Sequence, residues 1–171
     1  IVDDAATIFT HGDLSFLSYG GLTVEGDLTA DRMLLVDDSG NDLVIGGFLA
    51  AEEDIRIHSL QDDVRIDQGA TLIADTDGAT GGGEYNGIAI TAEGQLTTAA
   101  GSLMRVGPQG APTGDVSLAA HGLDGGGLAS LDLGSHIEAQ HLYLYTEAGS
   151  IRIRYGQILL DEDLDIDSPS G

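Results

Sequence analysis

The sequence predicts an all-β fold in which short strands stack as successive coils of a parallel β-helix. Pairs of apolar residues separated by one position begin at Leu22, Leu43 and Val64, so they recur at equal steps of 21 residues. A fixed period of this size is typical of solenoid proteins. Valine, isoleucine, leucine and threonine also alternate with polar residues along most of the chain, as in half-buried strands. The i, i+3, i+4 spacing that indicates amphipathic helices is missing.

The same apolar pairs continue at longer steps in the second half of the chain. They begin at Ile88, Val116 and Leu142, which follow at steps of 24, 28 and 26 residues after Val64. Because alternate residues of a strand point to opposite faces, the apolar residues of these pairs should all face one common core. The residues predicted to point inward are Leu22, Val24, Leu43, Ile45, Val64, Ile66, Ile88, Ile90, Val116, Leu118, Leu142 and Leu144.

Three Gly-rich stretches account for the longer steps. They cover residues 76–87, 107–114 and 122–127, and such clusters between periodic segments predict loops. Solenoids accept insertions at their corners, so we expect these loops there. Two further apolar segments, at Ile55 and Leu72, are interpreted as the second face of successive coils.

An antiparallel β-sandwich is the competing architecture. It also consists of short strands with turns every 8–12 residues. The equal early steps favour the β-helix, whereas the irregular second half is compatible with a sandwich.

The chain is predicted to form a single β-solenoid domain over residues 1–171. Residues 1–20 are expected to lead into the solenoid, as an N-terminal cap or as a strand exchanged with a neighbouring molecule. The coils are expected to occupy residues 21–160. Residues 161–171 form an acidic tail in which aspartate alternates with apolar residues, so a strand there would place its aspartates on one face and its apolar residues toward the core.

The charge of the chain is strongly negative. It contains 29 acidic and 6 basic residues, all six of them arginine, for a formal net charge of −23. Nucleic acid is excluded as a partner because its binding requires basic residues that neutralise phosphates. An anionic membrane surface would repel the chain, and no apolar run approaches the roughly 20 residues of a membrane span. High salt or divalent cations would reduce the self-repulsion.

Two acidic turns are candidate calcium sites. Calcium accepts six to eight oxygen ligands in irregular geometry, and carboxylates interspersed with glycine in a turn suit it. The alternative is that these residues only form turns, through hydrogen bonds to their own backbone. The candidate calcium ligands are Asp37, Asp38, Asn41, Asp42, Asp75 and Asp77.

The sequence predicts no enzyme. It has no cysteine and therefore no thiolate site. Its five histidines form no His-Glu-x-x-His motif, and no nucleophile elbow is present. Aromatic residues are 5% of the chain, without tryptophan, so the platforms expected of a polysaccharide-cleaving site are missing. A lyase would also need a basic residue as proton acceptor, and without lysine only arginine is available.

Several segments resemble the repeats of filamentous-haemagglutinin-type adhesins and related large bacterial exoproteins. The segments are GLTVEGDLTA, NDLVIGGFLAAEEDIRI, DDVRIDQGATLIAD, NGIAITAEGQLTTAAG and GDVSLAAHG. The resemblance covers about Gly21 to Gly122, with weaker similarity to Ile153. It implies a right-handed parallel β-helix, export to the cell surface, and an adhesive or matrix function. These repeats carry architecture, so no binding residue is transferred.

The expected function is therefore that of a non-catalytic, extracellular structural or adhesive module of a bacterial surface or secreted protein. The expected partners are further copies of the chain, or glycans of a host, cell surface or matrix. A self-assembling subunit of an extracellular filament is the first alternative. A carbohydrate-active β-helix is the weaker one.

Overall fold

The computed structural model describes residues 1–76, 87–121, 131–147 and 149–168. Within these ranges the chain forms twenty short strands in three sheets. No helix in the described part is long and apolar enough to cross a membrane.

Each sheet takes every third strand of the chain. Sheet A contains β3 (Leu22–Val24), β6 (Leu43–Ile45), β9 (Val64–Ile66), β12 (Leu96–Thr98), β15 (Leu131–Leu133) and β18 (Ile151–Ile153). Sheet B contains β1 (Thr7–Phe9), β4 (Asp27–Ala30), β7 (Phe48–Ala51), β10 (Thr71–Ala74), β13 (Leu103–Val106), β16 (His136–Ala139) and β19 (Ile158–Leu160). Sheet C contains β2 (Leu14–Ser18), β5 (Met33–Asp37), β8 (Ile55–Ser59), β11 (Gly87–Ala92), β14 (Asp115–Ala120), β17 (Leu142–Thr146) and β20 (Leu164–Asp167).

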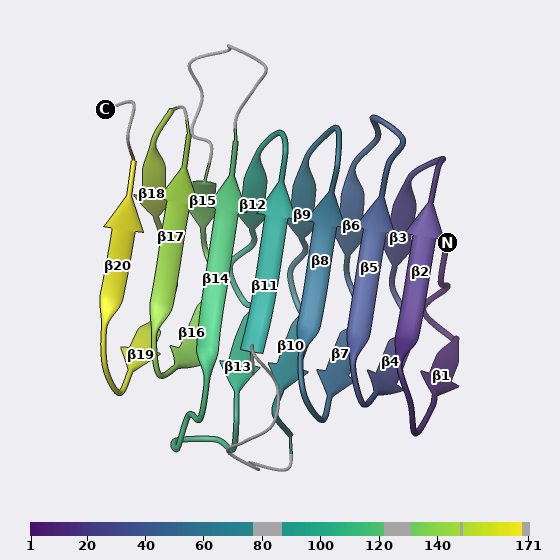
Figure 1. Ribbon diagram of the computed structural model, residues 1–171, viewed down its shortest axis with the longest axis horizontal. Coiled ribbons are helices and arrows are strands. Elements are labelled where there is room, and N and C mark those ends of the chain that lie inside the picture. The colour runs from purple at the N-terminus through teal and green to yellow at the C-terminus, as the bar shows by residue number, and fades with distance from the viewer. Residues whose placement is uncertain (77–86, 122–130, 148, 169–171) are drawn as a thin grey trace.

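All pairings between the described strands are parallel, so the chain is a parallel β-helix and the sandwich alternative is wrong. One coil consists of one strand from each sheet. In Figure 1 the strands of sheet C run upward at the front, the chain returns behind through sheets A and B, and successive coils advance from right to left. This path is right-handed, as the resemblance implied.

The equal early steps are confirmed as rungs of sheet A, where Leu22 pairs with Leu43 and Leu43 with Val64. The continuation of that series is corrected. Val64 pairs next with Leu96, which lies 32 residues further on. Ile88 belongs to sheet C, where it pairs with Ile55.

The interpretation of the second face is also corrected. Ile55 and Leu72 are not equivalent positions of successive coils, because Leu72 pairs with Leu49 in sheet B. The sequence pattern was interpreted as two faces per coil, whereas the coil has three. Two ladders were therefore merged into one series.

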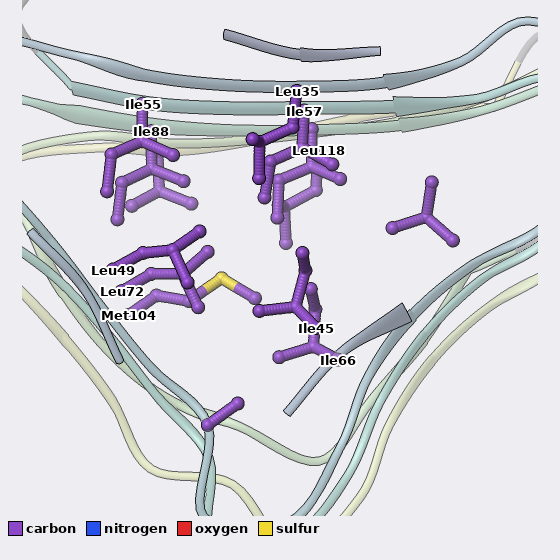
Figure 2. Close-up of a cluster of buried hydrophobic side chains, with 14 of the residues drawn as sticks. Leu35, Ile45, Leu49, Ile55, Ile57, Ile66, Leu72, Ile88, Met104 and Leu118 are labelled. Atoms are coloured by element: carbon purple, nitrogen blue, oxygen red, sulfur yellow. The ribbon is translucent and has the colours of Figure 1, made fainter. Parts of the chain in front are cut away.

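The core is one continuous stack of apolar side chains. All twelve residues predicted to point inward are buried, with at most 4% of their surface exposed. Sheet B adds a row that the sequence analysis largely missed, in which Leu49, Leu72 and Met104 lie directly over one another (Figure 2). Each coil thus buries its apolar face against the coils on either side, as stacked repeats do.

The corner between sheets A and B is tight. A Cβ atom added at Gly47 would collide with the carbonyl oxygen of Gly26 one coil earlier, and one at Gly156 would collide with the carbonyl oxygen of Ser135. Only glycine allows the backbones to approach this closely. Thr98 is a polar residue in line with Ile66 and Leu133 of sheet A. Its Oγ1 accepts hydrogen bonds from the backbone N–H groups of Gly134 (2.9 Å) and Ser135 (3.1 Å).

Longer connections occur at the other two corners. The Gly-rich stretch 107–114 is a loop between β13 and β14, as predicted. The other two stretches lie mostly outside the described residues, within the connections from β10 to β11 and from β14 to β15.

Both ends of the chain belong to the solenoid. Residues 1–20 contribute β1 and β2, which pair in parallel with β4 and β5, and Val2 forms a bridge with Val24. The acidic tail includes a strand, β20, whose Leu164 and Ile166 occupy the same register as the buried Leu142 and Leu144. The coils therefore extend beyond residue 160, to Asp167.

Candidate functional site

The predicted calcium ligands of the first acidic turn are divided between the inside and the outside of a corner. Asp37 is the last residue of β5 and is buried. Its Oδ2 accepts a hydrogen bond from Ser39 Oγ (2.7 Å). Asp38 instead reaches the next coil, where its Oδ1 accepts from Gln61 Nε2 (2.6 Å), and Asn41 Nδ2 donates to Ser39. The structure does not bring these residues together as one ligand set.

Asp42 meets two carboxylates that the sequence analysis did not assign to it. Asp62 and Asp63 lie at the corner between β8 and β9, one coil further on, and a carboxylate oxygen of each lies within 4.8 Å of the others and of Asp42. Asp63 follows Asp42 by 21 residues, so the early repeat period was a signal for this contact. We refer to Asp42, Asp62 and Asp63 as the acidic corner.

The second predicted calcium turn has a structural contact. Asp75 is buried, has a positive φ of 51°, and accepts a hydrogen bond from Thr113 Oγ1. This bond attaches the loop 107–114 to the preceding coil. Asp75 lies at the corner between sheets B and C, whereas the acidic corner lies between sheets C and A. Asp77 lies outside the described residues.

A small hollow lies between the loop 107–114 and the outer surface of sheet B. It has a volume of about 370 Å³, and its lining includes Pro112, Glu138 and Leu159. Glu138 Oε1 is 2.8 Å from His136 Nε2, whereas its buried Oε2 has no hydrogen-bond partner among the residues that the structure describes.

The most developed polar arrangement lies on the outer surface of sheet C, over the last three coils. His141 stands just before β17, between a carboxylate of the preceding coil and one of the following coil. Its Nδ1 is 2.7 Å from Asp115 Oδ1, and its Nε2 is 2.9 Å from Glu162 Oε2. The hydrogen bond to Asp115 raises the pKa of His141, and the negative charges of Asp115 and Glu162 add to this effect against partial desolvation.

Two tyrosines extend this arrangement along β17. Tyr143 and Tyr145 alternate with the buried Leu142 and Leu144 and so project outward. The Tyr143 ring stacks on His141 with centroids 6.0 Å apart and planes 28° apart. Desolvation, together with nearby carboxylates, raises the pKa of Tyr143.

Tyr145 has a similar neighbour from the adjacent coil. Its ring centroid is 5.8 Å from that of His121, and His121 Nδ1 is 2.9 Å from Glu147 Oε2. We use the name Tyr–His face for the outward side chains of Asp115, His121, His141, Tyr143, Tyr145, Glu147 and Glu162.

The Tyr–His face combines ring surfaces with hydrogen-bonding oxygens. Exposed aromatic rings can pack on the C–H groups of a ligand while a hydroxyl bonds its polar groups, and carboxylates accept hydrogen bonds from hydroxyl or ammonium groups. This face was not predicted from the sequence. Its signal was the Tyr-x-Tyr alternation at residues 143–145, opposite two core leucines.

Comparisons with protein-family models, curated proteins and solved structures found no match for this chain.

Proposed function

We propose that this chain is a non-catalytic structural and adhesive module of a bacterial surface or secreted protein. The observation that carries the proposal is that inward and outward residues of each coil have separate roles. Inward residues of the three sheets form one uninterrupted core, so outward residues can vary without affecting packing. Such a rod separates its binding surface from its stability, as repeat proteins with extended binding faces do. The resemblance of the repeats to exoprotein adhesins agrees with this function.

We assign the Tyr–His face as the adhesive surface and glycans as its ligands. Tyr143 supplies an exposed ring, and the adjacent Asp115 and Glu162 supply hydrogen-bond acceptors. A chain with a net charge of −23 repels sulfated or carboxylated polysaccharides. The expected ligands are therefore neutral or amino sugars.

The test is binding of the purified chain to immobilised neutral, amino-bearing and sulfated oligosaccharides. Tyr143→Ala should abolish or greatly weaken binding to the first two classes because it removes the stacking ring. Tyr19→Ala is the matched control, since Tyr19 is exposed in the first coil, at the opposite end of the rod. Equal binding by both variants, or preferential binding of the sulfated class, would contradict the assignment.

We propose a second, structural role for the acidic corner as a weak calcium site. Its three carboxylates come from two consecutive coils, Asp42 from one and Asp62 and Asp63 from the next, so an ion there would link the two coils and reduce the repulsion between the carboxylates. Calcium titration monitored by calorimetry should give a heat that Asp62→Asn removes. Asp27→Asn, at an exposed position of β4, should leave that heat unchanged. A signal unaffected by Asp62→Asn would assign the binding elsewhere.

A further inference from the structure

Glu138 is an outward-facing carboxylate that is nevertheless buried. It stands in β16 between Ile137 and Ala139, which belong to the core, so its own side chain points away from the core. Only 8% of its surface is exposed. The loop 107–114 lies over this part of sheet B, because Pro112 of the loop lines the same hollow as Glu138.

The loop is attached to the coils before and after it. Thr113 Oγ1 donates a hydrogen bond to Asp75, which follows β10. The backbone N–H of Gln140, which follows β16, donates to the carbonyl oxygen of Gly114 (2.7 Å). The backbone N–H of Thr113 also donates to the carbonyl oxygen of Val106 (3.2 Å). The wall that the loop forms above sheet B is therefore held in place by hydrogen bonds.

The carboxylate of Glu138 has an incomplete set of partners. His136 Nε2 lies against its Oε1, whereas Oε2 has no hydrogen-bond partner among the described residues. Arg105 is its neighbour in the strand register, but Arg105 Nε is also buried without a partner in the described part of the chain, so this side chain does not supply the missing donor. A buried carboxylate that lacks donors is costly. Because the terminal torsion of glutamate is soft, the carboxylate can turn toward a donor that enters the hollow.

The other walls of the hollow suit the carbon chain of a ligand. Pro112 and Leu159 supply apolar surface, and Asp161 adds a second, exposed carboxylate. The volume of about 370 Å³ is in the range of small-molecule pockets. An ammonium group supplies both the hydrogen-bond donors and the positive charge that Glu138 lacks. The net charge of −23 also raises the concentration of cations near the chain.

The depth of the hollow comes from the loop 107–114. Strands of one sheet lie side by side in its plane, about 4.8 Å apart. A further strand beside β19 would therefore extend the floor of the hollow and leave Glu138 and the loop as they are. Both of these parts belong to the two coils that precede the coil of β18, β19 and β20.

We propose that this hollow binds the ammonium group of a small aliphatic amine. Glu138 accepts hydrogen bonds from the ammonium group, and Asp161 adds a weaker attraction because it is exposed to solvent. The carbon chain of the amine packs against Pro112 and Leu159. The site lies on sheet B, apart from the Tyr–His face on sheet C, and its occupancy does not depend on glycan binding there.

The test uses n-butylammonium as the probe, at neutral pH and physiological salt, with amide chemical shifts as the readout. The shifts should change at Gly110, Glu138 and Leu159, and they should saturate. The uncharged n-butanol and the anionic butyrate have carbon chains of similar length. Each should bind at least about tenfold more weakly than n-butylammonium, because neither carries the charged donor.

Four variants locate the charge that is recognised. Glu138→Gln keeps the size of the side chain and should weaken n-butylammonium binding at least about tenfold. Asp161→Asn should have a smaller effect. Glu52→Gln makes the same change as Glu138→Gln at an exposed position between β7 and β8 and should leave the affinity unchanged. Tyr143→Ala should also leave it unchanged, because it alters only the Tyr–His face.

Circular dichroism checks that each variant is folded. If Glu138→Gln does not fold, the comparison of the three probes on the unmodified chain decides the question alone. Equal binding of n-butanol or butyrate would overturn the proposal, because the charge would then not be recognised. So would equal weakening by Glu52→Gln, which would indicate general attraction to an acidic chain. Shift changes confined to other surfaces, or no saturable change, would overturn it as well.

Discussion

An inner coil and the last coil share an alternating pattern of residues but differ in burial. The inner coil consists of β6, β7 and β8, and the last coil consists of β18, β19 and β20. Ile57 in β8 is 1% exposed, whereas Ile166, on the same inward face of sheet C, is 55% exposed. Both are isoleucines in alternating strands. The difference shows that a strand of this fold derives its burial from the coils beside it, because one coil cannot cover its own apolar face.

The comparison predicts unequal effects for the same substitution. Ile57→Ala should reduce the free energy of unfolding by about 2–5 kcal/mol, the usual effect of truncating a buried isoleucine. Ile166→Ala should reduce it by about 1 kcal/mol or less, because about half of that side chain is already in water. Urea unfolding followed by circular dichroism, at a protein concentration where the chain is monomeric, measures both. Equal losses would contradict the account of burial by neighbouring coils.

The tight corner of an inner coil gives the next largest effect. Gly47→Ala introduces a Cβ atom against the carbonyl oxygen of Gly26, and the resulting backbone shift should reduce stability by about 1–3 kcal/mol. Gly20→Ala is a suitable comparison because, apart from its chain neighbours, no atom of the described residues lies within 4 Å of the added Cβ. Its effect on the same urea transition should be less than about 1 kcal/mol. Comparable losses in the two variants would show that the corner tolerates a side chain.

The smallest effect concerns the attachment of the last coil through His141. The pKa of this imidazole is raised in the folded chain, so its stabilising contribution is complete below the unfolded value near 6.5 and is lost as pH rises through the folded pKa. Above that pH one ring nitrogen presents a lone pair to a carboxylate. Amide hydrogen exchange in β20, corrected for intrinsic rates, should become faster over this interval.

His141→Gln provides the control for that measurement, since glutamine does not titrate. Exchange in β20 should then lose most of its dependence on pH in this interval, while β8 should be unaffected in both proteins. A pH dependence that persists in His141→Gln would assign the effect to other groups of the last coil.

The sequence predicted the fold well where corners have constant length and poorly where they do not. Leu22, Leu43 and Val64 revealed the period because the connections between them are equal. Beyond Val64 the insertions changed every step, so Ile88 was assigned to the ladder of sheet A instead of sheet C. Strand alternation alone identifies which residues are inward, but the partner of each strand depends on loop lengths.

The same limit applies to the candidate sites. Asp42 and Asp63 are one early period apart, and their proximity could have been predicted from that spacing. The position of His141 between Asp115 and Glu162 is less regular, because the two partners are 26 and 21 residues away along the chain and only the second separation equals the early period. Each separation spans one coil of the structure, although the two differ in number of residues.

The three corners of the coil differ in how much sequence they can accept. Connections from sheet A to sheet B are always two to four residues long, whereas those from B to C reach twelve and those from C to A reach ten. Two edges of the rod are therefore open to new loops, and the third edge, with its closely approaching backbones, is closed to them. Acquired surface features, whether natural or engineered by peptide grafting, should accumulate along those two edges on either side of sheet C.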